Sequence, residues 1–130
     1  MVRFIPVGLL LLAGCAAVPA EPVTLVGDWG GPHVALHLTP SGGSLDYDCA
    51  HGSITPVLVG PGGRFVAEGT HTPEHGGPVR EGEVLPTYPA HYSGVVRGDR
   101  MSLAGRIESG VELGPFELRR GIQPMLTRCL

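Results

Sequence analysis

The chain has 130 residues, with 9 basic and 12 acidic side chains and a formal net charge of −3. This length suits a single domain, and the acidic balance argues against a basic nucleic-acid-binding module. The 21 glycines and 13 prolines exclude a bundle of long helices. A hydrophobic content of 42% argues against disorder.

The first 14 residues have the pattern of an export leader. Arg3 is followed by the apolar run Phe4–Leu12, far shorter than the roughly 20 residues that span a bilayer. The run ends in Leu12-Ala13-Gly14-Cys15, which resembles the lipobox of bacterial lipoproteins. That resemblance implies cleavage before Cys15 and attachment of diacylglycerol and palmitate-type acyl chains there. The alternative is an ordinary secretory leader that is cleaved later, for example after Ala20.

The lipobox resemblance also implies where the protein resides. Two or three acyl chains hold a protein durably at a membrane, so we expect an anchor in the bacterial cell envelope. Because Ala16 rather than Asp follows Cys15, the outer membrane is preferred if the cell is Gram-negative. Residues 15–26 would form the lipidated cysteine and a proline-containing, extended tether. Residues 27–130 would form the folded domain.

Two cysteines remain for the domain, Cys49 and Cys129. An even pair in an exported domain predicts one disulfide, which here would attach the C-terminus to the second predicted strand. The alternatives are a metal pair formed by Cys49 with His51, or a catalytic thiol at Cys49.

Short runs of alternating apolar and polar residues, separated by Gly and Pro, recur along the domain. This spacing is typical of antiparallel strands, and no long crossover helix is indicated. We therefore predict an all-β fold, a small antiparallel β-barrel or barrel-like sandwich of about seven or eight strands. The predicted strands are 33–38, 44–49, 54–59, 65–70, 88–96, 101–107, 111–113 and 116–119, with a last strand or a strap at 125–130.

Gly27-Asp28-Trp29, just before the first predicted strand, resembles the Gly-x-Trp signature of lipocalin-like (calycin) barrels. The resemblance implies that Trp29 plugs one end of the barrel beneath an Arg from a late strand. Arg119 and Arg120 both lie at a suitable place in the chain, and we take Arg119 as the partner. Three further stretches, 29–33, 48–52 and 74–78, resemble small exported bacterial proteins of unassigned function.

The six histidines raise the question of a metal site. His33 and His37 are four residues apart on one strand, roughly 13 Å, which is too far for one zinc ion. A turn could bring His71 and His75 together with His51, but no recognised zinc spacing results. We therefore predict no metal and no cofactor, with these three histidines as weak candidates.

The long polar segment 73–87 is the most distinctive loop in the sequence. Long loops in compact domains are often functional or mobile. His75, Arg80 and Tyr88 are candidates for lining the mouth of the barrel, and an external loop without a ligand is the alternative.

These observations predict a non-enzymatic binding module at the cell envelope. Its partners would be the membrane, through the lipid, and a small, apolar ligand inside the barrel; nucleic acid is not expected. The first alternative is a structural, docking or inhibitor lipoprotein with a filled barrel that binds an envelope protein. The second is a metal-dependent enzyme that uses the histidine-rich loop.

Overall fold

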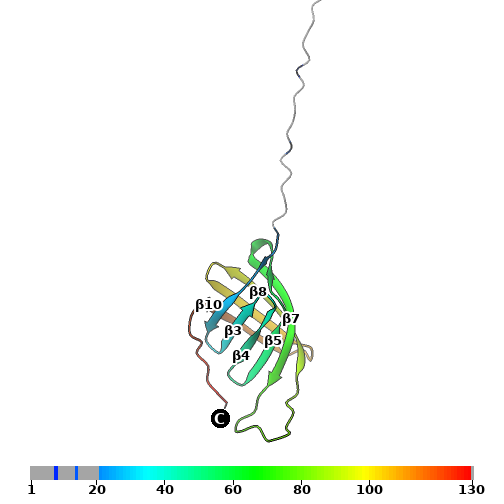
Figure 1. The fold of residues 1–130 in the computed structure, drawn as a ribbon, viewed down its shortest axis with the longest axis vertical. Helices are drawn as coiled ribbons and strands as arrows, with labels where there is room; N and C mark the ends of the chain where they lie inside the picture. Colours follow the sequence, from blue (N-terminus) through cyan, green and yellow to red (C-terminus); the bar gives the residue numbers. More distant parts are fainter. Residues whose placement is uncertain (1–7, 9–13, 15–20, 130) are drawn as a thin grey trace, which may run out of the picture.

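The structure, a computed structural model, describes Gly8, Gly14 and residues 21–129. Cys15 and the rest of the lipobox apart from Gly14 lie outside the described residues. Within 21–129 the chain is almost entirely β (Figure 1). The strands are β1 (Val23–Thr24), β2 (Gly27–Gly31), β3 (Val34–Thr39), β4 (Gly42–Tyr47), β5 (Ala50–Ile54), β6 (Leu58–Val59), β7 (Arg64–Pro73), β8 (Tyr88–Arg97), β9 (Arg100–Ile107) and β10 (Glu112–Arg120), with one short 3-10 turn, η1 (Pro61–Gly63).

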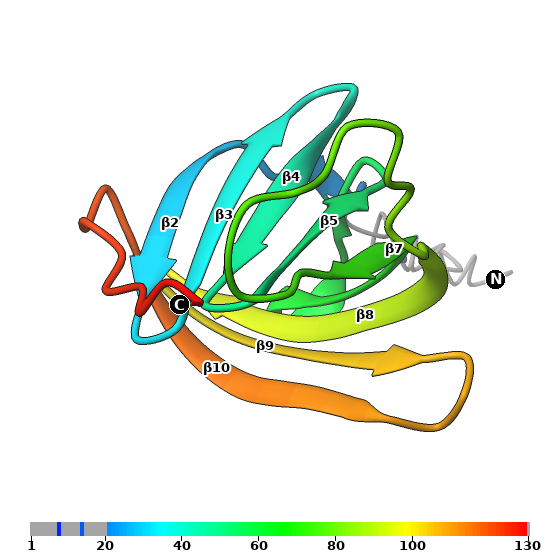
Figure 2. The ribbon, with the colours of Figure 1, turned by 90° about the horizontal axis from the view of Figure 1, so that it is seen from below.

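Eight of these strands close into an antiparallel barrel in the order β10-β2-β3-β4-β5-β7-β8-β9. Each barrel strand pairs with the next barrel strand along the chain, and β10 pairs with β2 to close the ring (Figure 2). The remaining two, β1 and β6, form a separate two-stranded sheet. The predicted all-β barrel is therefore confirmed, and the sandwich alternative is not what forms. No helix in the described part of the chain is long and apolar enough to cross a membrane.

Alternation of apolar and polar residues explains why most of these segments form strands with one buried and one exposed face. In β3, Val34, Leu36 and Leu38 are buried, whereas His37 between them is exposed. Successive side chains of a strand point to opposite faces, so one face of this run fills the barrel and the other meets solvent.

Several predicted strand boundaries were wrong. The runs 111–113 and 116–119 belong to one strand, β10, and most of β5 was not predicted as a strand. Gly27-Asp28-Trp29 does not precede the first barrel strand but belongs to it, as β2. The run 54–59 is not one strand: Ile54 ends β5, and Leu58–Val59 pairs with β1. The sequence of β5, Ala-His-Gly-Ser-Ile, has little apolar character because Gly52 occupies an inward position. A Cβ on Gly52 would lie 2.3 Å from the backbone carbonyl of Thr70 and 3.2 Å from the hydroxyl of Tyr92, which explains why no larger side chain is found there.

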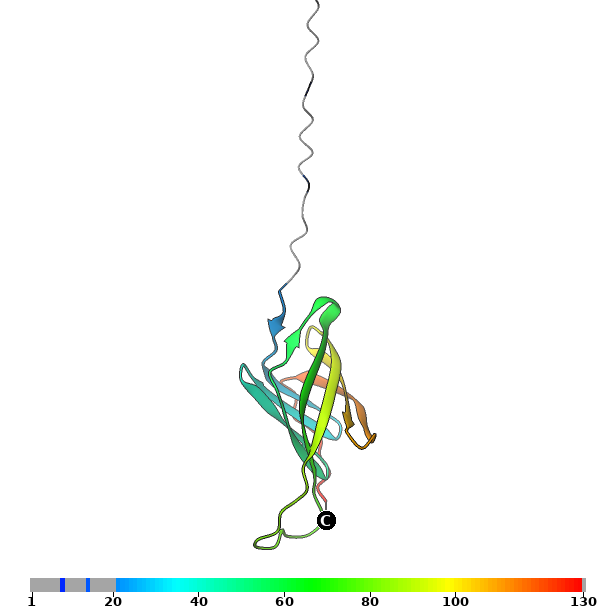
Figure 3. The same cartoon turned by 90° about the vertical axis from the view of Figure 1, so that its right-hand side faces the viewer.

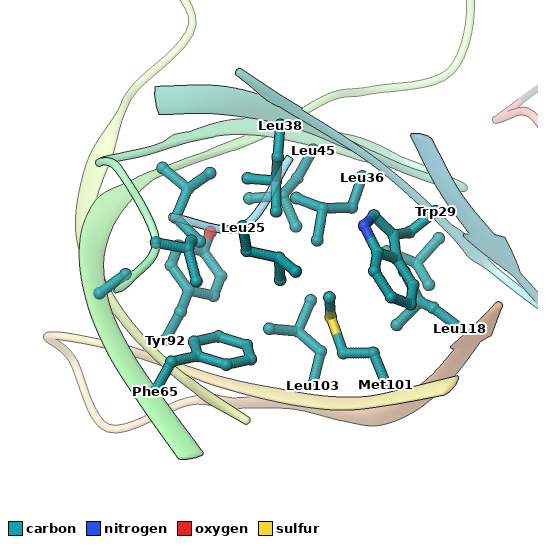
Figure 4. Close-up of a cluster of buried hydrophobic side chains, with 14 of the residues drawn as sticks. Leu25, Trp29, Leu36, Leu38, Leu45, Phe65, Tyr92, Met101, Leu103 and Leu118 are labelled. Atoms are coloured by element: carbon teal, nitrogen blue, oxygen red, sulfur yellow. The ribbon is translucent and has the colours of Figure 1, made fainter. Parts of the chain in front are cut away.

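The barrel interior is packed with apolar side chains from all eight barrel strands (Figure 4). Tyr92 lies over inward-facing glycines of neighbouring strands: a Cβ on Gly69 would be 2.9 Å from its ring, and one on Gly105 would be 3.0 Å from it. The barrel thus accommodates the ring of Tyr92 by omitting side chains from the strands on either side of β8. The core consists of Leu25, Trp29, Val34, Leu36, Leu38, Leu45, Tyr47, Ala50, Ile54, Val57, Phe65, Ala67, Ala90, Tyr92, Met101, Leu103 and Leu118.

The two ends of the barrel differ. The described chain enters at one end, where Val23–Thr24 of the predicted tether already pair with β6 and Leu25 packs into the core. The loop 74–87 extends from the opposite end (Figure 3). We call these the entry end and the loop end.

After β10, residues 121–129 run as a strap across the outside of the barrel. Met125 forms an isolated bridge with Pro32, and the Met125 amide donates to the Gly31 carbonyl at 3.1 Å. The Thr127 amide donates to Asp48 Oδ1 at 2.7 Å. The predicted disulfide is confirmed: Cys129 is bonded to Cys49, with their Cα atoms 5.2 Å apart. The C-terminal segment is a strap rather than a barrel strand.

Candidate functional site

The predicted Trp–Arg contact forms with the neighbouring arginine. Trp29 is buried, and the guanidinium of Arg120, not Arg119, lies 4.4 Å from the centre of its rings. Arg120 Nη1 also donates to the carbonyl of Val26 at 2.8 Å. Because Leu118 points inward, strand alternation gives Arg120 the inward phase and places Arg119 on the outer face. Trp29 and Arg120 therefore hold the entry end together, and Arg119 remains exposed.

Two of the three residues proposed for the mouth, His75 and Arg80, are joined through Glu83. His75 Nε2 pairs with Glu83 Oε1 at 2.6 Å, and the Arg80 amide donates to Glu83 Oε2 at 2.9 Å. A hydrogen bond to the Gly76 carbonyl and the pairing with Glu83 raise the pKa of His75. The amide of Arg80 and the nearby His75 lower the pKa of Glu83. Tyr88 begins β8 opposite His71 and is partly exposed.

The three histidines named as weak metal candidates are not brought together. His51 pairs with Glu74 at 2.7 Å, His75 pairs with Glu83, and His71 points into the barrel. Among the described residues, no group of three or more His, Cys, Asp or Glu side chains is positioned to hold a metal ion. Five of the six histidines instead form carboxylate pairs, which are His33–Asp48, His37–Asp28, His51–Glu74, His75–Glu83 and His91–Glu68.

The sixth histidine belongs to a polar group inside the barrel. His71 is 6% exposed and Tyr47 is 7% exposed, and their ring centres are 5.3 Å apart. Neither His71 Nδ1 nor the Tyr47 hydroxyl has a hydrogen-bond partner among the described residues, whereas the Tyr92 hydroxyl donates to the Thr70 carbonyl at 3.0 Å. Burial raises the pKa of Tyr47. Burial, with the nearby His51, lowers the pKa of His71 and keeps its imidazole neutral.

The outer surface carries a hollow of about 490 Å³ between β10, the end of β2 and the strap. We call it the strap groove. Arg100 of β9 and Arg119 of β10 line one side, and Ile122 and Met125 of the strap line another. None of the proposed mouth residues His75, Arg80 and Tyr88 lines it.

Arg100 was not predicted as a site residue, and Arg119 was predicted to lie over Trp29 instead. One signal was present: the turn Arg97-Gly98-Asp99-Arg100 makes Arg97 and Arg100 opposite partners in a hairpin. The pairing of Arg100 with Arg119 depends on how β10 aligns with β9, where a bulge between Leu113 and Phe116 shifts the register. Local sequence does not fix that shift.

No protein-family model, curated protein or solved structure matches this chain. The closed antiparallel barrel is the fold that the lipocalin-like resemblance implies, but membership of that family stays a prediction.

Proposed function

We propose that this protein is a non-enzymatic binding module, tethered to the bacterial cell envelope by lipid on Cys15, that binds its ligand on the outside of a filled barrel. The lipobox Leu12-Ala13-Gly14-Cys15 supports the tether. The Cys49–Cys129 disulfide supports export, because such bonds persist in oxidising compartments.

The proposal of an external binding site rests on one contrast: side chains fill the barrel interior, whereas the outer surface has a hollow. Apolar side chains converge on the barrel axis from opposite walls (Figure 4), and the buried set includes large residues such as Trp29, Leu36 and Met101. A barrel of eight strands is just wide enough for side chains to fill it. This packing favours a ligand on the outer face over an apolar ligand enclosed within the barrel. A docking role for the same filled barrel is the second candidate, favoured by the same packing.

The strand pairing at the entry end also supports a folded domain that lies close to the membrane. Val23 and Thr24 already pair with the barrel-associated strand β6. Only residues 16–22 therefore lie between Cys15 and Val23, so the distance from the lipidated residue to the folded domain is about 27 Å at most. The domain would be held next to the lipid surface with its entry end facing it.

The tether is tested by expressing the full chain and its Cys15→Ser variant in a bacterium, with Ala17→Ser as the matched control. We expect the parent and the control to enter the detergent phase and to carry the mass of a diacylglyceryl group on residue 15. The Cys15→Ser variant should lose both properties. A mature chain that begins after Ala20, or a Cys15→Ser variant that stays in the membrane fraction, would contradict the proposal.

A further inference from the structure

We propose that the strap groove binds an anionic amphiphile, a molecule with one phosphate or carboxylate head and an apolar chain. The head would lie between Arg100 and Arg119, and the chain would lie along Ile122 and Met125. This inference deepens the proposed function by naming its ligand class and site, but it does not depend on the lipid at Cys15.

The positive charge of the strap groove comes from the alignment of three neighbouring strands. Arg97 of β8 is directly opposite Arg100 of β9, and Arg100 is directly opposite Arg119 of β10. Three arginines thus lie in a row across three neighbouring strands, and all three are exposed. Like charges directly opposite each other destabilise a sheet. An anion bound between two of these guanidinium groups would relieve that repulsion.

Among the described residues, no acidic side chain forms an ion pair with Arg97, Arg100 or Arg119. The arginine ion pairs between described residues are Arg106–Glu112 and Arg120–Asp99. Glu117 also lines the strap groove, but it is not within ion-pair distance of Arg100 or Arg119. The Cβ atoms of directly opposed residues are about 5 Å apart, so both guanidinium groups can reach one phosphate or carboxylate. Arginine forms bidentate, charge-assisted hydrogen bonds with both kinds of head group.

The apolar side of the groove is exposed and fixed in place. Ile122 is 53% exposed and Met125 is 67% exposed, although both are large apolar residues. The strap that carries them is held by backbone hydrogen bonds from Met125 and by the disulfide at Cys129. Gly30 lets the strap approach β2, because a Cβ there would overlap the Ile122 carbonyl. A charged side and an apolar side therefore face one hollow of about 490 Å³, a size that suits a small ligand.

The test uses the oxidised chain from residue 16 onward, since every strand and the disulfide lie within residues 23–129. The probes are decyl phosphate below its micellar concentration, inorganic phosphate and neutral decyl maltoside, each titrated calorimetrically. The test variant is Arg100→Gln with Arg119→Gln. The matched control is Arg64→Gln with Arg106→Gln, which removes the same charge from exposed arginines that do not line the groove. Thermal melts establish that each variant is folded.

We expect decyl phosphate to bind more tightly than either of the other probes. The Arg100/Arg119 variant should weaken that binding by about tenfold or more, whereas the Arg64/Arg106 control should leave it unchanged. Ile122→Ser with Met125→Ser should weaken binding of decyl phosphate but not of inorganic phosphate.

Three results would overturn the inference. Equal affinity for inorganic and decyl phosphate would indicate an anion site without an apolar part. Equal losses in both arginine variants would indicate general attraction to charge rather than a groove. Binding to anionic vesicles without binding to monomeric decyl phosphate would assign the arginine row to the membrane surface. Failure of the lipid tether would be seen in the separate Cys15→Ser experiment and would leave these results unaffected.

Discussion

Removing the disulfide should be among the most destabilising changes that leave the barrel core intact. The bond joins residues 80 apart in the sequence. For a loop of that size, the chain-entropy model gives a stabilisation of about 4.5 kcal/mol at 25 °C. We therefore expect Cys49→Ala with Cys129→Ala to lower the free energy of unfolding by about that amount, and the Tm by roughly 20 °C. The strap keeps the Thr127–Asp48 hydrogen bond in the folded variant, so the barrel itself should still form.

Urea titration, followed by circular dichroism, measures this loss directly. Reductant provides the control: it should destabilise the parent chain by the same amount and leave the double variant unchanged. A loss below about 1 kcal/mol would refute the reasoning, because the unfolded chain would then gain little freedom from opening the loop. Sensitivity of the double variant to reductant would also refute it.

Three further predictions concern the interior. Tyr47→Phe should leave stability unchanged or raise it by about 1 kcal/mol in urea titration, because its buried hydroxyl has no partner among the described residues; a clear loss would show that the hydroxyl is satisfied by a bound molecule. Since burial lowers the pKa of His71 in the folded state, the unfolded chain takes up that proton first, and stability should fall as the pH drops below about 6.5. His71→Phe should flatten this part of the stability–pH curve, and an unchanged slope would assign it to other groups. Gly94→Ala should cost about 1–3 kcal/mol in thermal unfolding, because a Cβ there would lie 2.5 Å from the ring of Phe65; an unchanged Tm would contradict this packing.

Strands could be predicted from the sequence where apolar and polar residues alternate clearly, as in Val34–Thr39. They could not be predicted where contacts with adjacent strands determine which residue fits. β5 is an example, since a Cβ on Gly52 would lie 2.3 Å from the Thr70 carbonyl of β7 and 3.2 Å from the Tyr92 hydroxyl of β8, which come 18 and 40 positions later in the chain. A strand with a glycine in an inward position has no apolar periodicity to detect. These neighbours on β7 and β8 are known only once the strands have paired.

The candidate site was predicted less well, for a related reason. The mouth residues were chosen from loop length, but loop length does not specify where side chains point. Arg120, rather than Arg119, lies over Trp29, and strand alternation from Leu118 could have predicted this. The opposed arginines of the strap groove could not be found in the same way, because their meeting depends on strand register and on the path of the strap.

Sequence patterns were enough to predict an antiparallel β fold, turns at the Gly- and Pro-rich segments, and the pairing of Cys49 with Cys129. These features follow from period-two alternation, from backbone freedom at turns and from an even number of cysteines in the domain, all of which can be read along the chain. The folded barrel was needed to show that Arg100 and Arg119 lie side by side, that Tyr47 and His71 meet inside the barrel, and that the strap forms one side of a groove. Those contacts depend on barrel closure and on a bulge in β10, and both are set by the packing of residues far apart in the chain.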